Sequence, residues 1–272
     1  MVVSRALLLL GAALVIGGVS AASAADLGGM KDEPVYAPAT PSLRPSVYFR
    51  LDGGYSEYDE PTITENGVYT LTESEIGGAG FIGGGVGVSL GGGFRGDLTY
   101  DHLFESDVSA NLPDYQLDLP GTRAFGFSSD VFLANLYYDF NWGGRFTPYV
   151  GVGLGFARNK TSAGTVTDPC GCVIGEIESG SSTDVAAAAM AGFAFKIRGG
   201  QETIQGSFKD APMVVDSGRG LFLDVGYRFL YLSEVSTGQI NATYNNQPVS
   251  EDPTVEDIHA HQIRAGLRYQ LN

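Results

Sequence analysis

The stretch between residues 258 and 271 alternates between apolar and polar or small side chains, reading IHAHQIRAGLRYQL. Successive side chains of a β-strand point to opposite faces. One face would therefore carry His261, Ile263, Ala265, Leu267, Tyr269 and Leu271, and the other Gln262, Arg264, Gly266, Arg268 and Gln270. A strand of about 9 to 11 residues crosses a bilayer with its apolar groups against lipid and its polar groups in a lumen. The pattern predicts a membrane-crossing strand.

Seven earlier segments also read as strands, so that the predicted strands are 47–58, 76–90, 93–104, 129–141, 146–158, 184–198, 221–233 and 258–271. The connections 59–75, 105–128, 159–183 and 234–257 are long, whereas Gly91-Gly92 and Trp142–Arg145 are tight hairpin turns. Long loops outside and short turns inside are typical of outer-membrane proteins. We therefore expect an all-β fold, an eight-stranded antiparallel up-and-down transmembrane β-barrel.

One connection departs from this alternation. Residues 199–220 occupy a place where a short turn is expected. An extra hairpin around Thr203–Phe208 and Met213–Asp216 would give the alternative of ten strands.

Charged residues occupy the polar face of two predicted strands: Arg95, Asp97 and Asp101 in the third, and Asp224 and Arg228 in the seventh. A charge left on the lipid face near the bilayer midplane costs about 2 to 4 kcal/mol, so we expect these five side chains in the lumen. Pairs such as Arg228 with Asp224, or Arg95 with Asp97, would close it. Glycines at 83, 85, 87, 151, 153 and 155 would instead leave gaps and a narrow pore for small solutes. A water-soluble barrel or sandwich would reverse the two faces.

The N-terminal region reads as an export signal followed by a leader. Residues 1–24 contain Arg5, an apolar run from Ala6 to Ile16 and the small triplet Ala22-Ser23-Ala24, which predicts a cleaved signal peptide. Residues 25–45 are Pro-rich and are expected to form an extended periplasmic leader. Residues 46–272 form the expected barrel domain, and the expected location is the outer membrane of a Gram-negative cell.

Composition agrees with a single large β-domain. The chain has 39 Gly, 15 Phe, 14 Tyr and only 17% charged residues. Its mean hydropathy is near zero, because a barrel averages apolar and polar faces.

Two segments carry a family resemblance. Residues 132–140 (FLANLYYDF) and 147–155 (TPYVGVGLG) resemble a hairpin of the opacity-like small outer-membrane β-barrel surface antigens, which have an OmpA-like transmembrane fold. The order Arg264, Gly266, Tyr269, Leu271 resembles the C-terminal assembly signal that the barrel-assembly machinery reads, although Asn272 stands where an aromatic residue is usual. The resemblance implies roles in envelope integrity, surface antigenicity or adhesion, sometimes with weak pore activity, and no catalytic residues.

The four long connections together carry a net charge of −15, equal to that of the whole chain. An anionic cap would repel polyanions, so we expect no nucleic-acid partner. It would hold divalent cations loosely beside lipopolysaccharide and outer-membrane lipids, or meet an external receptor. The plainer interpretation is a solvated surface.

Candidate chemistry is sparse. Cys170 and Cys172 fall in an oxidising compartment, where a local disulfide is expected although one intervening residue strains the ring. No further Cys or His lies nearby to complete a metal site. His102 with Glu105 and Ser106 is the one close grouping that an esterase could use, and His102 is more simply an interface residue. The sequence predicts no enzyme, cofactor or metal.

Overall fold

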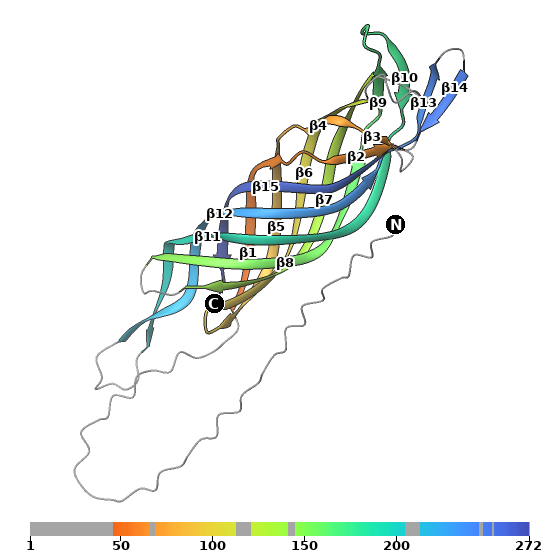
Figure 1. Ribbon diagram of the computed structural model, residues 1–272. Coiled ribbons are helices and arrows are strands. Elements are labelled where there is room, and N and C mark those ends of the chain that lie inside the picture. The colour runs from red at the N-terminus through yellow and green to blue at the C-terminus, as the bar shows by residue number, and fades with distance from the viewer. Residues whose placement is uncertain are drawn as a thin grey trace, which may run out of the picture. The chain divides into compact units, whose positions relative to one another are not determined.

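The computed structural model describes residues 46–65, 69–112, 121–140, 145–204, 213–244, 247–251 and 253–271. Eight of the strands within these ranges pair in a closed antiparallel ring, in the order β1-β5-β6-β7-β8-β11-β12-β15 and back to β1 (Figure 1). Their bounds are β1 Ser46–Tyr58, β5 Ala79–Gly91, β6 Phe94–Leu112, β7 Gly121–Asp139, β8 Phe146–Thr161, β11 Gly180–Ile204, β12 Met213–Ser236 and β15 Pro253–Gln270. No described helix is long and apolar enough to cross a membrane.

The ring closes between the first and last of these strands. Phe49 of β1 lies opposite Tyr269 of β15, and Tyr55 opposite Ile263. Each of the eight predicted strands coincides with one ring strand, which confirms the eight-stranded antiparallel barrel.

The alternative of ten strands is wrong. Residues 201–204 pair with residues 213–216, from Gln201 opposite Asp216 to Ile204 opposite Met213. The two arms therefore lengthen β11 and β12 and add no strand to the ring. Residues 205–212, which contain part of the expected hairpin, lie outside the described residues, as do the N-terminal segments 1–24 and 25–45 and most of the predicted turn 142–145.

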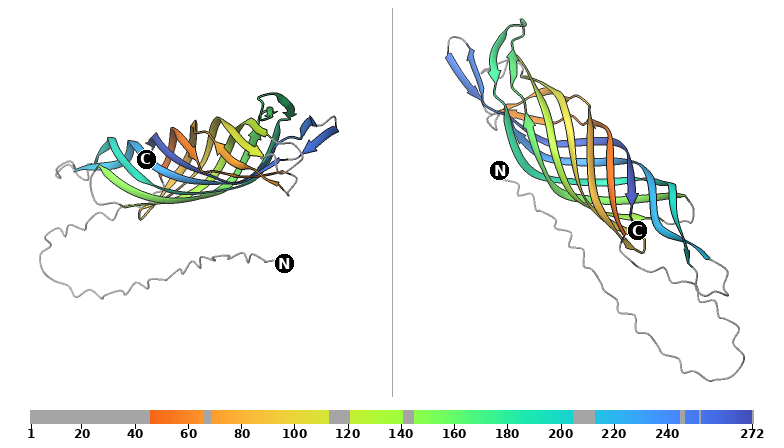
Figure 2. Two further views of the ribbon diagram at one scale, coloured as in Figure 1. Left: turned by 45° about the horizontal axis from the view of Figure 1, so that its top comes forward. Right: turned by 180° about the vertical axis from the view of Figure 1, so that it is seen from behind.

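At the opposite end of the ring the strands also extend further than predicted. The acidic connections were expected to be loops, yet β6 continues to Leu112 and β7 begins at Gly121. Seven short strands occupy the rest: β2 Thr62–Glu65, β3 Tyr69–Thr70, β4 Thr72–Ile76, β9 Gly164–Thr167, β10 Val173–Ile177, β13 Ile240–Tyr244 and β14 Gln247–Glu251. Figure 2 shows them gathered at one end, which we call the extended end. The end with the turn at Gly91–Gly93, whose φ angles are all positive, is the turn end.

The two faces of the ring differ in polarity. Apolar side chains on its outside are exposed, including Leu51 at 62%, Leu98 at 63% and Leu154 at 64%. The inside has two tiers. Buried charged and polar residues fill the part nearer the turn end, and an apolar cluster that includes Leu103, Phe127, Leu230 and Ile258 fills the part nearer the extended end.

Candidate functional site

The polar tier inside the ring is the candidate site. Because strand residues alternate between faces, every second position of the ring strands points inward. In this tier the buried charged or amide side chains at these positions are Arg50, Asp52, Arg95, Asp97, Asp101, Asn135, Asp224, Arg228, Gln262, Arg264 and Arg268. All five predicted lumen charges, Arg95, Asp97, Asp101, Asp224 and Arg228, are among them. Arg123 and Asn159 are also buried, nearer the extended end.

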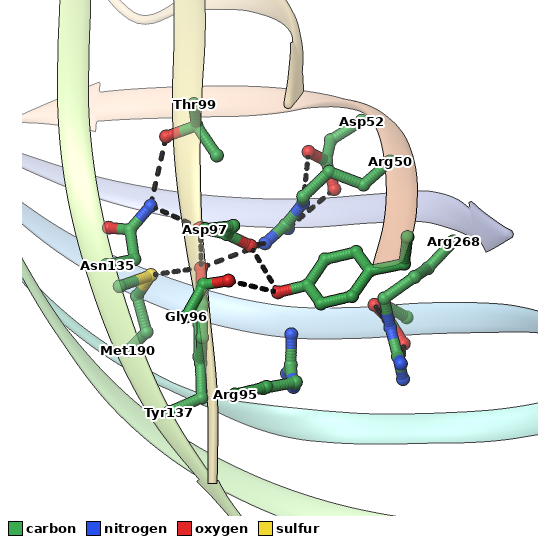
Figure 3. Close-up of polar contacts among 12 residues, drawn as sticks. Arg50, Asp52, Arg95, Gly96, Asp97, Thr99, Asn135, Tyr137, Met190 and Arg268 are labelled. Atoms are coloured by element: carbon green, nitrogen blue, oxygen red, sulfur yellow. Dashed lines mark hydrogen bonds and ion pairs between the residues drawn. The ribbon is translucent and has the colours of Figure 1, made fainter. Parts of the chain in front are cut away.

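Arg50 connects three strands of this tier. Its Nε and Nη2 donate to the two oxygens of Asp52 at 2.9 and 2.7 Å. Its Nη1 donates to Asp97 Oδ2 at 3.0 Å and to the Tyr137 hydroxyl at 2.8 Å. Arg50 is on β1, Asp97 on β6 and Tyr137 on β7, so that one guanidinium joins well-separated parts of the wall (Figure 3).

Asp97 is the acceptor at the centre of the close-up in Figure 3. The Tyr48 hydroxyl donates to its Oδ2 at 3.0 Å, and Asn135 Nδ2 donates to its Oδ1 at 2.8 Å. With the bond from Arg50, both carboxylate oxygens are occupied. A buried charge is tolerated only when paired and hydrogen-bonded in this way.

Arg95 lies below this group, toward the turn end. Its Nε donates to Asp139 Oδ1 at 2.9 Å. The guanidinium carbon lies 4.0 Å from the ring centroid of Tyr137 and 4.9 Å from that of Tyr149. These two rings pack edge to face, so that a cation and two aromatic rings pack together at this level of the interior.

A second group lies among β6, β12 and β15. Arg228 pairs with Asp101 and donates through Nε to Gln262. Arg264 Nη2 lies 2.9 Å from Asp52 Oδ2. Because Asp52 also binds Arg50 of the first group, Arg264 joins the two groups. Arg268 Nε donates to Asp224 Oδ2 at 2.9 Å.

The predicted pairings between these charges are therefore wrong, although the side chains are inside. Arg228 binds Asp101 instead of Asp224, and Arg95 binds Asp139 instead of Asp97. Asp224 and Arg228, four residues apart on one strand, are separated by about 13 Å, whereas inward side chains of other strands meet across the narrow lumen of an eight-stranded barrel. Arg95 and Asp97 are only two residues apart, but Asp97 pairs with Arg50 of β1 instead. The sequence analysis did not identify Arg50 and Asp52 as lumen residues. They alternate with the outward Phe49 and Leu51, and this alternation was the signal that could have placed them inside.

The inward glycines leave no gaps of the kind expected from the sequence. A Cβ at Gly87 would collide with the ring of Tyr48, and one at Gly151 would collide with the ring of Tyr137. One at Gly83 would collide with the carboxylate of Asp101. At these three positions the glycine provides the space that a side chain of a neighbouring strand fills. At Gly85 and Gly155 a Cβ would instead meet backbone of the neighbouring strand, at Leu98 O and Phe132 O.

Apolar side chains fill the interior nearer the extended end. Phe81 and Leu103 are 3% and 0% exposed, and the Tyr58 and Phe127 rings pack edge to face with centroids 5.8 Å apart. Tyr58 lies in the extended end, where burial raises the pKa of its phenol. Together the two tiers form a packed interior.

The possible esterase grouping does not converge. His102 points outward, where its Nδ1 lies 2.8 Å from Asp130. Ser106 is buried at 3% exposure, whereas Glu105 is exposed. The serine and histidine are thus on opposite faces of the sheet. No cluster of three or more metal-ligating side chains occurs within the described ranges.

Cys170 and Cys172 lie in the turn between β9 and β10, and both are exposed and free. The expected local disulfide is not formed in the structure. Asp168 Oδ1 accepts the backbone N–H groups of Cys170 and Cys172 at 2.9 and 2.8 Å, and Gly171 between them has a φ of 87°. The turn is closed by these bonds, and a ring through a single spacer residue would be strained.

The residues of the predicted assembly signal divide between the two faces. Arg264 is buried inside and a Cβ at Gly266 would meet Asp52, whereas Tyr269 is 51% and Leu271 39% exposed. The signal therefore combines inward groups with an outward apolar edge at the turn end.

The chain is similar to several known proteins, although no protein-family model matches it. Uncharacterised proteins of Brucella suis biovar 1 and Brucella melitensis biotype 1 are each 27% identical over 94% of this chain and 95% of theirs. Neisserial surface protein A overlaps with a TM-score of 0.42 at 14% identity, covering 83% of this chain and 97% of that chain. The outer membrane protein OprG from Pseudomonas aeruginosa overlaps with a TM-score of 0.44 at 11% identity, covering 83% and 96%. The function is therefore inferred from the residues of this chain.

Proposed function

We propose that the protein is an outer-membrane β-barrel with a closed lumen, which serves the envelope as a structural and surface-presenting element. The observation that carries this proposal is the reversal of polarity across one wall. Leu51 and Leu98 are more than 60% exposed on the outside, whereas Arg50 and Asp97, at neighbouring positions, are at most 6% exposed inside. A water-soluble barrel would bury the first pair and expose the second.

The outer face supports a location in lipid. Large apolar side chains cover it on every ring strand, and its aromatic residues lie toward both ends. Tyr55, Tyr100, Phe132 and Phe156 lie toward the extended end, and Phe49, Phe94, Tyr138 and Phe146 toward the turn end. An apolar band between two aromatic girdles is typical of outer-membrane barrels. A contiguous exposed patch of this extent on a soluble monomer would promote aggregation.

The packed interior favours a structural role over the alternative, a narrow pore. A conducting lumen needs a continuous wet path, whereas Arg95 with its two tyrosine rings, the Asp97 group and the apolar tier lie in series along the axis. The ion pairs of the polar tier are bidentate or join different strands. Breaking them to open a path through the lumen would therefore cost free energy.

The extended end would then face outward and present the acidic strands. In this orientation the surface of the extended end, which faces outward, is anionic. It would contact divalent cations, lipopolysaccharide or a receptor. The barrel-assembly machinery is the proposed partner during insertion, through Arg264, Gly266, Tyr269 and Leu271.

A planar-bilayer recording tests the closed lumen. Purified folded protein should give no steady single-channel conductance. The matched control replaces Arg95 and Tyr137 with Ala, which removes one blocked level and should give at most brief openings because the apolar tier persists. Uniform conductance steps from the wild-type protein would favour the pore. Migration in unboiled SDS gels should differ from that of the boiled chain, which confirms that the recorded sample was folded.

A further inference from the structure

Two exposed cations lie side by side on the outward face of β8, near the extended end. In the segments that form this end, 57–79, 104–130, 157–185 and 230–261, Lys or Arg occurs only at Arg123, Arg158 and Lys160. Asp and Glu recur in all four segments. Arg123 is buried. The accessible positive charge of a strongly acidic end is thus concentrated at two positions that alternate on one strand.

The neighbouring side chains hold Lys160 in place. Its Nζ donates to Asp130 Oδ2 at 2.6 Å, and the Tyr100 hydroxyl and His102 Nδ1 each lie 2.8 Å from Asp130 Oδ1. Asp130 lies just beyond the exposed apolar band. Its carboxylate is thus held by Lys160, His102 and Tyr100 together.

The group keeps donors for a ligand. A lysine ammonium has three donors, of which Lys160 gives one to Asp130. Arg158 is opposite Asp130 in the β7–β8 register and opposite Thr183 of β11, and its exposed side chain has no partner among the described residues. Two cations beside one carboxylate leave a positive balance, so that an anion can bind between Arg158 and Lys160.

An apolar column continues directly from this position along the same strand. Phe156, Leu154 and Val152 follow at alternate positions and are 50%, 64% and 60% exposed. Phe156 stacks on Phe132 of β7, with ring centroids 5.0 Å apart. A ligand held at Arg158 and Lys160 would therefore rest on apolar surface toward the turn end and meet water only on the other side.

We propose that Arg158 and Lys160 bind the phosphate of a phosphorylated lipid of the outer leaflet, whose acyl chain lies along Phe156, Leu154 and Val152. The proposal rests on the proposed function, since it needs this wall to face lipid. An arginine fork matches two phosphate oxygens. A free anion would use the two cations alone, whereas the apolar column gives a lipid additional surface to cover.

Native mass spectrometry of the full folded protein, released from detergent micelles, tests this site. The probes are lipid A carrying its phosphates, the same lipid after enzymatic dephosphorylation, and inorganic phosphate. The variant Arg158→Gln/Lys160→Gln should weaken retention of phosphorylated lipid A by about tenfold or more, because charge-assisted hydrogen bonds are lost. Arg145→Gln, at the exposed residue just before β8 at the turn end, is the matched control and should change nothing.

A second variant separates binding from stabilisation of the wall. Asp130→Asn frees Lys160 and makes the group more positive, so it should retain phosphorylated lipid A as well as or better than the wild type. Equal retention of the phosphorylated and dephosphorylated lipid by the wild type would overturn the proposal, as would displacement by inorganic phosphate at equal concentration. Both glutamine variants should still show heat-modifiable migration, which keeps a lost lipid site distinct from failure of the barrel itself.

Discussion

Arg228 and Asp101 form an ion pair across the barrel, and both side chains are fully buried. Arg228 belongs to β12 and Asp101 to β6, which lie four places apart in a ring of eight strands and are therefore on opposite walls. The two residues are 127 positions apart in the sequence. This contact can form only when the ring has closed, so it joins barrel assembly to closure of the lumen.

The variant Arg228→Leu should lower the free energy of unfolding by about 3 to 5 kcal/mol, because Asp101 stays charged and buried and keeps only the longer contact with Arg264, whose Nη2 lies 4.0 Å away. Urea unfolding in micelles, followed by the shift between folded and unfolded gel bands, measures the loss. The double variant Arg228→Leu/Asp101→Leu should recover much of it, since no uncompensated charge remains. Equal losses in the single and double variants would contradict this account.

Gly151 should be intolerant of a side chain for as long as Tyr137 is present. The first carbon of any side chain at position 151 would overlap the Tyr137 ring. Gly151→Val should therefore destabilise the barrel by about 1 to 3 kcal/mol. In the Tyr137→Ala background the added cost should be much smaller. A double-mutant cycle on the unfolding free energies measures this coupling, and strictly additive effects would refute the proposed packing.

Labelling of the two native cysteines tests which end of the barrel faces outward, and it needs no cysteine to be introduced at the extended end. Cys170 and Cys172 are exposed at the β9–β10 turn of the extended end, which we propose faces outward. A membrane-impermeant maleimide should label them on intact cells, either directly or, if they are paired in the cell, after mild reduction. In a Cys170→Ser/Cys172→Ser background, Arg145→Cys at the turn end should be labelled only after lysis. Labelling of Arg145→Cys on intact cells would reverse the orientation.

The strands of the ring could be predicted because each position is either inward or outward. Alternation such as Leu221, Leu223, Val225 and Tyr227 against Asp224, Gly226 and Arg228 determines the face of each residue. Partners across the lumen could not be predicted this way. The choice of Asp101 for Arg228 depends on strand tilt and on which strands lie opposite each other, and neither is encoded within one strand.

The extended end was misread for a different reason. Its segments are rich in Asp and Glu, which is typical of loops, yet their apolar residues still alternate. Val108, Ala110 and Leu112 are buried at 2%, 1% and 1% exposure, while Asp107 on the same strand is exposed. Acidic residues here are the outer face of a strand that continues beyond the apolar band. Alternation was the informative signal, and overall polarity concealed it.

Deletion of residues 269–272 should prevent stable closure of the barrel. Tyr269 pairs with Phe49 of β1 on one side and Leu221 of β12 on the other, and the Leu271 N–H donates to Val47 O at 2.9 Å. The truncated chain loses these bonds and leaves two unpaired strand edges at the turn end, which favour aggregation. It also loses Tyr269 and Leu271, half of the proposed assembly signal.

The truncated protein should therefore accumulate as a protease-sensitive species in the periplasm, measured by fractionation and by heat-modifiable migration. Asn272→Phe is the matched control: it alters the same end while leaving every described backbone bond in place, and it should reach the outer membrane at normal or higher yield. The point variant Tyr269→Ala separates the two causes, because it keeps the strand pairing and removes only the aromatic group. Normal yield of Tyr269→Ala with failure of the deletion would assign the defect to the open edges. Normal insertion of the deletion itself would mean that closure between β1 and β15 does not require these residues.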